Sequence, residues 1–218
     1  MTSRLAGRTA ATLLLLGPLC AGCSAGDEPS APASSSAPPA TVVPASAAEL
    51  ESLLVTDVPS GLPLVPDDEL DPPAGEKTID DVARYGDDAQ EQRAVLEDYG
   101  YLRGWERFWR SGDQLTSVFV DQFDGPHGAE AYAEDLARND AEFYGGSLDH
   151  SPADLPGGCV VMVRDFPTPE RGMAGPAAFA WCATGVFTVA VASVAASPAQ
   201  ARAELTAVTR AQVDRIDG

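Results

Sequence analysis

Few side chains in this sequence could transfer a proton near neutral pH. Histidine is the usual proton shuttle in proteins, and the chain has only His127 and His150. Asp121 and Asp124 precede His127 at a spacing that could gather the three side chains into a base or a metal site. A histidine in the first turn of a helix is more commonly an exposed surface residue. Both interpretations therefore stay open at this point.

Common catalytic motifs are missing from the sequence. It has no G-x-S-x-G, H-E-x-x-H, P-loop or G-x-G-x-x-G pattern. The 33 acidic residues allow too many carboxylate pairings to dismiss glycoside hydrolysis. We therefore expect a non-catalytic binding protein with no catalytic residue, metal or cofactor. A cell-wall hydrolase or other enzyme using Asp121, Asp124 or His127 is the alternative.

Two cysteines in the second half of the chain are candidates for a disulfide. Cys159 and Cys182 each lie at or near the end of an expected strand, 23 positions apart. In an oxidising compartment two such thiols most simply form a structural disulfide. The competing hypothesis is a zinc site built from both cysteines with His127 and His150. Neither C-x-x-C nor H-x-x-x-H spacing is present to support that site.

Tryptophans on one expected strand form the best candidate for a binding surface. Trp105 and Trp109 lie four positions apart, and side chains on a strand alternate between faces with a period of two. The two rings therefore share one face of the strand. If that face is open, it would bind a sugar or an apolar ligand; the plainer alternative is core packing beneath a helix.

The N-terminus has the pattern of an export signal. Arg4 and Arg8 precede an uncharged stretch over residues 9–19, which is too short to span a bilayer permanently. The following Ala21-Gly22-Cys23 resembles the lipobox of bacterial lipoproteins, in which the cysteine is lipidated, although Cys20 holds the place where leucine is usual. An ordinary secreted protein cut near Ala21 or Ala25 is the alternative.

The remaining composition predicts how the exported chain is organised. Residues 24–47 are nearly all Ser, Ala, Pro and Thr, which predicts a disordered linker. We therefore expect a signal peptide over residues 1–22, a lipidated Cys23 with its linker over 23–47, and one extracytoplasmic domain over 48–218. The protein would then be held to the outer face of the cell membrane by its N-terminal lipid.

Charge excludes one class of partner. The formal net charge is −19, and an acidic surface repels the phosphates of nucleic acids. Fifteen acidic residues and three basic ones lie between Glu49 and Gly100. Acidic runs are most often solvated surface, so this segment is only the second-ranked candidate for a binding surface.

Periodicity in the chain predicts an α+β domain. Strand-like runs occur at residues 104–109, 115–123, 159–164, 177–182 and 186–194. Long helices begin near Pro126 and Pro198, and a shorter helical segment begins at Thr78, with Asp81 completing a capping box. We expect an antiparallel sheet of about five strands covered by the two long helices, preceded by a short N-terminal helix.

The two halves of this domain align under a shift of 72 residues. Trp109 then falls on Trp181, Pro126 on Pro198 and Asp113 on Gly185, so the halves are either an internal ββα duplication or a chance match.

The same shift helps to decide the structure of residues 177–196, an uncharged run long enough for a membrane helix. Because its counterpart in the first half carries charges, two buried strands are the favoured prediction.

The order of these features resembles a group of exported lipoproteins of actinobacteria. The resemblance is carried by the signal, Cys23, the linker, the segment from Leu53 to Leu62 and the later Gly100-Tyr101-Leu102-Arg103-Gly104-Trp105. Such proteins mostly have no assigned function, and some are suspected ligand carriers or envelope sensors. The resemblance implies a lipoprotein carrying palmitate that binds a small ligand or an envelope protein. A passive structural component of the envelope is a further alternative.

Overall fold

The computed structural model of the chain describes residues 43–218. The expected signal peptide, Cys23 and most of the expected linker lie outside the described residues. The expected domain boundary at residue 48 falls within the first described helix, α1, which spans Ala47–Ser52.

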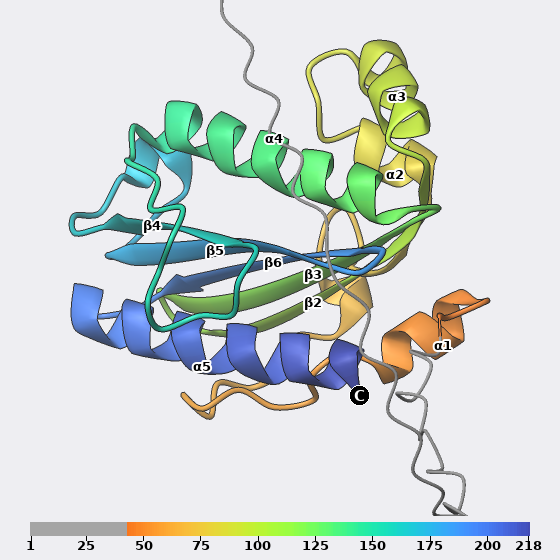
Figure 1. The fold of residues 1–218 in the computed structure, drawn as a ribbon. Coiled ribbons are helices and arrows are strands. Elements are labelled where there is room, and N and C mark those ends of the chain that lie inside the picture. Colours follow the sequence, from red (N-terminus) through yellow and green to blue (C-terminus); the bar gives the residue numbers. More distant parts are fainter. Residues whose placement is uncertain (1–42) are drawn as a thin grey trace, which may run out of the picture. The chain divides into compact units, whose positions relative to one another are not determined.

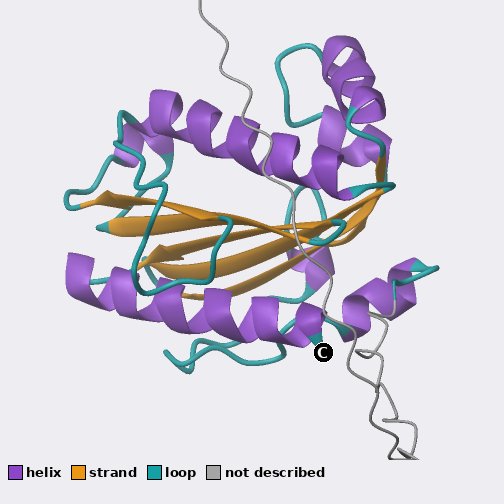
Figure 2. Ribbon diagram, viewed as in Figure 1, coloured by secondary structure: helices purple, strands orange, loops and turns teal. Residues whose placement is uncertain are grey.

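The described chain is an α+β fold built on one antiparallel sheet (Figures 1 and 2). Its six strands have the order β1-β2-β3-β6-β5-β4. After α1 the elements are 3₁₀ η1 (Asp67–Glu69), β1 (Gly75–Lys77), α2 (Ile79–Ala83), α3 (Ala89–Asp98), β2 (Tyr101–Ser111), β3 (Gln114–Phe123), α4 (Pro126–Tyr144), β4 (Cys159–Arg164), 3₁₀ η2 (Pro169–Arg171), β5 (Ala177–Thr184), β6 (Phe187–Val194) and α5 (Pro198–Asp217).

Local sequence signals explain where the helices begin. Thr78 caps α2 by accepting a hydrogen bond from the Asp81 backbone, and the Asp81 side chain accepts from the Thr78 backbone, which completes the expected capping box. Proline occupies the first turn of both α4 and α5, where its missing N–H leaves no intrahelical bond unmade. The Ser197 side chain caps α5 by accepting from the Gln200 backbone.

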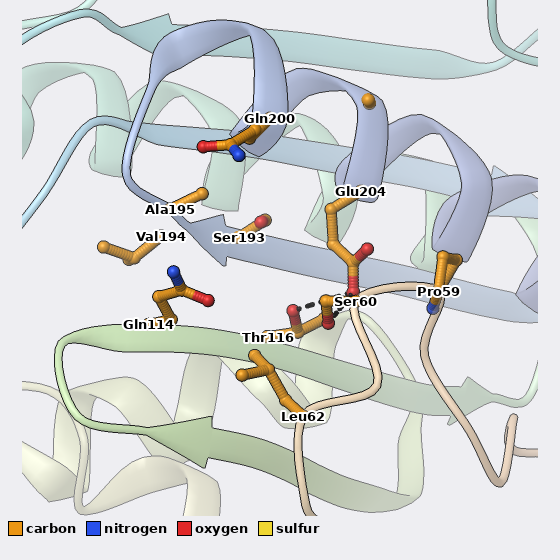
Figure 3. A pocket seen from close by; sticks show the side chains of 11 residues that line it. Pro59, Ser60, Leu62, Gln114, Thr116, Ser193, Val194, Ala195, Gln200 and Glu204 are labelled. Carbon is orange, nitrogen blue, oxygen red and sulfur yellow. Dashed lines mark hydrogen bonds between the residues drawn. The ribbon is translucent and has the colours of Figure 1, made fainter.

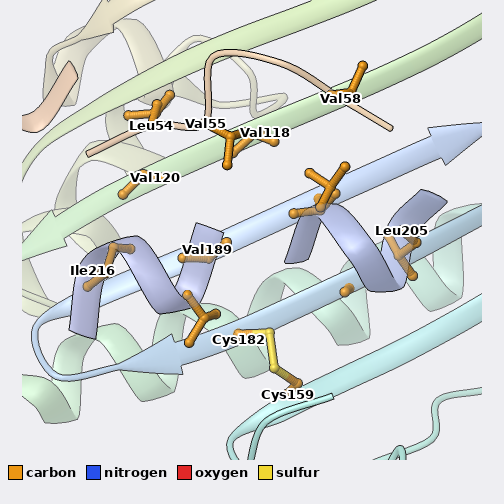
Figure 4. Packing of buried hydrophobic residues seen from close by; sticks show 14 of the residues in the cluster. Leu54, Val55, Val58, Val118, Val120, Cys159, Cys182, Val189, Leu205 and Ile216 are labelled. Atoms are coloured by element: carbon orange, nitrogen blue, oxygen red, sulfur yellow. A yellow bond between two sulfur atoms is a disulfide. The ribbon is translucent and has the colours of Figure 1, made fainter. Parts of the chain in front are cut away.

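The two long helices pack on opposite faces of the sheet (Figure 1). Below the sheet in this view, α5 covers an aliphatic core that includes Val118, Val189 and Leu205 (Figure 4). Above it, α4 covers a second cluster that contains Phe179 and Trp181. A third cluster joins α2, α3 and the start of α4 around Phe123. Each face of the sheet therefore has its own core, because side chains alternate along every strand.

The sheet has one strand more than the expected five. The additional strand, β1, pairs with β2 at the edge of the sheet, with Lys77 opposite Gly104. Three residues of the sequence Gly-Glu-Lys carry no alternating apolar pattern, so nothing in their composition indicates a strand. Lys77 is nevertheless buried, with 3% of its surface exposed.

Both expected strand-turn-strand-helix units are present, but they are not packed alike. Gly112 and Gly185 take the left-handed conformation at the two hairpin turns. The two turns are therefore one residue further apart than the 72-residue shift that aligns Asp113 with Gly185. Moreover, α4 packs mainly on the strands of the other unit, β5 and β6, whereas α5 packs on its own hairpin. The similarity of the halves is thus one of element order and not of arrangement.

The uncharged run at residues 177–196 forms the hairpin of β5 and β6, as the charged counterpart segment predicts. A membrane helix in this run is therefore wrong. Among residues 43–218, no helix combines the length and apolar character that crossing a membrane requires.

Cys159 and Cys182 form a disulfide, as their placement predicts, and not a zinc site (Figure 4). They lie opposite each other in the register of β4 and β5. The bond therefore joins the edge strand β4 to its only partner in the sheet order. Within the described residues, no group of three or more His, Cys, Asp or Glu side chains is placed to hold a metal ion.

We expect the double variant Cys159→Ala/Cys182→Ala to lower the free energy of unfolding by about 3 kcal/mol, because the 23-residue separation sets the chain entropy that the cross-link removes from the unfolded state. Urea unfolding followed by tryptophan fluorescence measures the change. Hydrogen exchange should show that β4 amides lose protection before those of β3. An unchanged urea midpoint would show that the disulfide does not stabilise the fold, and would contradict this expectation.

Candidate functional site

A small cavity lies between α4, α2 and the upper face of the sheet, and we call it the α4 cavity. Its volume is about 160 Å³, which is below the usual range for drug-sized ligands and suits a small molecule or one group of a larger one. Its lining combines aromatic, aliphatic and carboxylate side chains from six elements or their ends. The lining residues are Val82, Tyr85, Glu106, Phe119, Asp121, Tyr132, Leu136, Asp140, Trp181 and Ala190.

Asp121 is one of two deeply buried carboxylates in this lining. It lies on β3 with 7% of its surface exposed, and one of its oxygens accepts a hydrogen bond from the Tyr101 hydroxyl at 3.1 Å. Gly104 faces Asp121 across the β2–β3 pair, where a Cβ atom would collide with both the carboxylate and the Tyr101 hydroxyl. The missing side chain at position 104 is therefore what makes room for this pair.

Among residues 43–218, Glu106 is the only one of the three lining carboxylates with a cationic partner. Lys77 approaches it at 3.1 Å, and the Tyr85 hydroxyl donates to its other oxygen at 2.8 Å. The Lys77 ammonium also donates to the Pro73 carbonyl at 2.6 Å. Glu106 is 4% exposed, so this ion pair is buried, and loss of either partner would leave an uncompensated charge.

Asp140 and the rings of Tyr132 and Trp181 close the cavity on the α4 side. Asp140 and Tyr132 project from α4, and the Trp181 side chain on β5 lines the same cavity. Trp181 in turn stacks on Phe179, with ring centroids 5.8 Å apart and planes nearly parallel. This stacking fixes the Trp181 ring, and with it the wall that Asp140 faces.

Burial keeps the pKa values of these carboxyl groups high. Desolvation raises the pKa of Asp121 to about 7, although the Tyr101 hydrogen bond acts in the opposite direction. Desolvation likewise raises the pKa of Asp140 to about 6 against the hydrogen bond from Trp181. The pKa of Glu106 is also raised by desolvation, despite the lowering effects of Tyr85 and Lys77. Clusters of perturbed carboxyl groups in a cavity are typical of functional sites.

A larger groove of about 370 Å³ lies on the opposite face, between α5, the end of β6 and residues 59–62 (Figure 3). Its one charged side chain, Glu204, accepts hydrogen bonds from the Ser60 hydroxyl at 2.6 Å and the Thr116 hydroxyl at 3.3 Å. Glu204 thus ties α5 to β3 and to the segment before β1. We call this groove the α5 groove; both hydroxyls donate to the same oxygen of Glu204, Oε1.

The three residues expected to form a base or metal site are not brought together. Asp121 faces the α4 cavity, whereas Asp124 and His127 are exposed beyond the end of β3. No hydrogen bond or ion pair joins any two of them in the described part of the chain. His150 is also exposed, and its Nδ1 lies 3.7 Å from Glu134. Only Asp121, from the sequence-based candidates for chemistry, belongs to a cavity.

Trp105 and Trp109 do share one face of β2, as their spacing predicts, but that face is covered. Trp109 is 1% exposed within the core beneath the sheet, and the half-buried Trp105 packs against the same core. Core packing, the plainer of the two alternatives, therefore describes their positions. An open aromatic platform at these two residues is ruled out by the burial of Trp109.

Most of the cavity residues were not identifiable as a group from the sequence. Lys77, Glu106 and Asp140 are isolated charges in three different elements, and only the folded sheet brings them near Asp121. One sequence signal pointed toward the site. Tyr101 and Gly104, in a segment that carries the resemblance to exported lipoproteins, are the residues that hold and accommodate the Asp121 carboxylate.

Comparison with known proteins gives little further information. No protein-family model matches the chain, and no curated protein is similar to it in sequence. Among solved structures, the extracellular domain of PknH from Mycobacterium tuberculosis resembles it with a TM-score of 0.45 and 13% sequence identity, over 80% of this chain and 98% of that domain. Because this similarity is so distant, we infer no ligand, partner or activity from it.

We expect Asp121→Asn to change how stability depends on pH. The folded state keeps the Asp121 proton up to about pH 7, whereas the unfolded chain releases it near its ordinary pKa of 3.8. This group therefore stabilises the fold most below pH 4, and the contribution falls by up to about 1.4 kcal/mol per pH unit as the pH rises toward 7.

Urea unfolding at pH 4.5, 6 and 7.5 would measure this difference between the wild type and the variant. The introduced amide still accepts from Tyr101 but carries no charge, so the stability of the variant relative to the wild type should increase with pH. Asp124→Asn, at an exposed carboxylate three residues along, is the matched control and should follow the wild type. Parallel profiles for Asp121→Asn and the wild type would contradict a raised pKa at Asp121.

Proposed function

We propose that this chain is a non-catalytic lipoprotein that binds a small ligand in the α4 cavity on the extracytoplasmic face of the cell membrane. The observation that carries the proposal is the lining of the cavity. Apolar walls supplied by Phe119, Leu136 and Trp181 surround polar groups of Asp121 and Asp140, and this mixture is the usual make-up of a ligand site.

The α4 cavity supports ligand binding better than the α5 groove does. In the groove, the Ser60 and Thr116 hydroxyls donate to one oxygen of Glu204, which is the single carboxylate of a lining without aromatic side chains. In the cavity, one Asp121 oxygen accepts from Tyr101, and no hydrogen bond from the described residues reaches the other oxygen. This second oxygen is therefore available to accept a hydrogen bond from a ligand.

The proposed location is supported by sequence and covalent structure together. The signal-like N-terminus and Cys23 favour export and lipidation. The Cys159–Cys182 disulfide is consistent with this location, because disulfides persist mainly in oxidising compartments outside the cytoplasm. An envelope protein remains the alternative partner, and it would bind an exposed surface instead of the cavity.

The chain purified from its own host under gentle conditions should retain its ligand in native mass spectrometry. Ala190→Leu fills the cavity from β6 and should abolish the mass increment. Ala203→Leu makes the same change in the α5 groove and should leave the increment in place. A wild-type mass equal to that of the unliganded chain, or retention in Ala190→Leu but loss in Ala203→Leu, would contradict binding in the α4 cavity.

A hydrolase is kept as a second candidate by one observation. Asp121 and Asp140 line the same cavity with pKa values of about 7 and 6, a range that suits a general acid and a general base. Incubation of purified cell wall with the wild type and with Asp121→Asn separates the two functions. Soluble fragments released by the wild type and not by the variant would overturn the non-catalytic proposal.

Lipidation at Cys23 is testable in the host. Cys23→Ser removes the thiol that would carry the lipid, so the chain should appear in the medium or accumulate as an unprocessed precursor. Fractionation with immunoblotting measures the distribution. Ser30→Ala, in the expected linker, is the control and should leave the chain in the membrane fraction. Unchanged membrane retention of Cys23→Ser would contradict an anchor at this residue.

A further inference from the structure

We propose that the α4 cavity selects an organic cation, with an ammonium or amidinium group held near Asp121 and Asp140 and an apolar or aromatic part extending over Phe119. This inference rests on the proposed function, because it specifies the ligand of the same site. It is carried by the balance of charge in the cavity, by the unused acceptors of its carboxylates and by the apolar surface at its mouth.

The charged groups around the cavity are unequal in number. Glu106 on β2, Asp121 on β3 and Asp140 on α4 belong to its lining, and Lys77 on β1 is the only cation within ion-pairing distance of any of them among the described residues. On α2 and its C-terminal end, Asp81 and Arg84 are not in the lining, and they pair with each other at 2.9 Å. The lining residues of β5 and β6 are the uncharged Trp181 and Ala190. The site therefore has a negative excess once its carboxyl groups ionise.

Lys77 cannot remove this excess, because its ammonium is held by Glu106 and by the Pro73 carbonyl. Asp121 accepts one hydrogen bond, from Tyr101, and Trp181 is the one residue that lowers the pKa of Asp140. An ionised carboxylate has about four acceptor positions. Both groups therefore keep acceptors for a ligand that carries several N–H donors, which an anion such as a carboxylate lacks.

Aromatic rings make the same site favourable for a cation with an apolar substituent. Trp181 and Tyr132 present rings to the cavity, and such rings attract cations through their quadrupoles. At its mouth, Phe119 meets Phe108 edge to face at 5.4 Å. A shallower depression of about 350 Å³ shares Tyr85, Glu106 and Phe119 with the cavity and continues toward Leu70. The cavity thus admits a small charged head, and this depression receives the apolar part.

Three probes of similar size separate charge from shape: benzylammonium, benzyl alcohol and benzoate. Each is titrated into the purified chain at pH 7.5, with binding followed by calorimetry and by NMR shifts of the Trp181 indole. We expect benzylammonium to bind at least tenfold more tightly than benzyl alcohol, and benzoate not to bind. Benzylammonium affinity should also increase between pH 5.5 and pH 7.5, as Asp121 and Asp140 lose their protons.

Charge-removing variants test where the cation lies. Asp121→Asn and Asp140→Asn should each weaken benzylammonium binding at least tenfold and leave benzyl alcohol unaffected. Asp124→Asn, an exposed neighbour outside the cavity, should change neither affinity. Circular dichroism verifies that every variant is folded. Equal loss in the Asp124 variant would reduce the effect to the net charge of the protein and overturn the inference.

The outcomes distinguish this inference from the proposed function. Equal affinity for the three probes, or preference for benzoate, overturns selection of a cation and leaves ligand binding in the cavity intact. A neutral or anionic ligand retained by the host-purified chain, and lost in Ala190→Leu, does the same. Failure of benzylammonium to bind, together with an unliganded wild-type mass, overturns both.

Discussion

The unequal number of charges beneath α4 is the constraint on which the rest of the site depends. Three carboxylates and one lysine are placed where the sheet, α2 and α4 keep most water away. Lys77 and Glu106 neutralise each other, so Asp121 and Asp140 must stay protonated, gain a partner or carry the cost of a buried charge. The folded protein meets this constraint by raising the pKa of both groups, which leaves them able to ionise near neutral pH.

The arrangement of the two long helices explains why this site is on one face only. On the lower face, α5 and α1 bury aliphatic side chains and the disulfide in a single large core (Figure 4). On the upper face, α4 packs mainly on β5 and β6, and the shorter α2 and α3 lie near β2. The boundary between these two covers is filled by polar side chains and by Tyr85, which is half exposed. A cavity forms where neither cover packs fully.

The fold was more predictable from the sequence than the site. Apolar alternation located β2 to β6, and proline and capping residues located the starts of α2, α4 and α5, because these signals act over a few neighbouring residues. β1 was missed because its three residues are stabilised by long-range partners: Lys77 is buried through Glu106, 29 positions away. The Trp105/Trp109 face was correctly predicted as shared, but spacing along one strand does not reveal whether a helix covers it.

The residues of the site could not be predicted from local sequence patterns as the helices and strands could. Asp121 was noticed for its distance from His127 along the chain, yet its neighbours in space are Tyr101, Gly104 and Glu106 from the adjacent strand. The environment of a buried carboxylate depends on which residues of the adjacent strand lie opposite it. The sequence alone does not specify that strand register. Here Gly104 is informative, because a position without a side chain opposite an aspartate leaves space that another polar group, the Tyr101 hydroxyl, occupies.

The same desolvation also links folding to ligand binding. Without a ligand, an ionised Asp121 makes the folded state less stable than a protonated Asp121 does. The free energy of unfolding is therefore lower near neutral pH than at acidic pH. A ligand that supplies positive charge and N–H donors compensates this cost only when it is bound, and its affinity then includes the removal of that penalty as well as its direct contacts. Under the proposed cation binding, recognition of the ligand accounts for a carboxylate whose ionised form destabilises the fold.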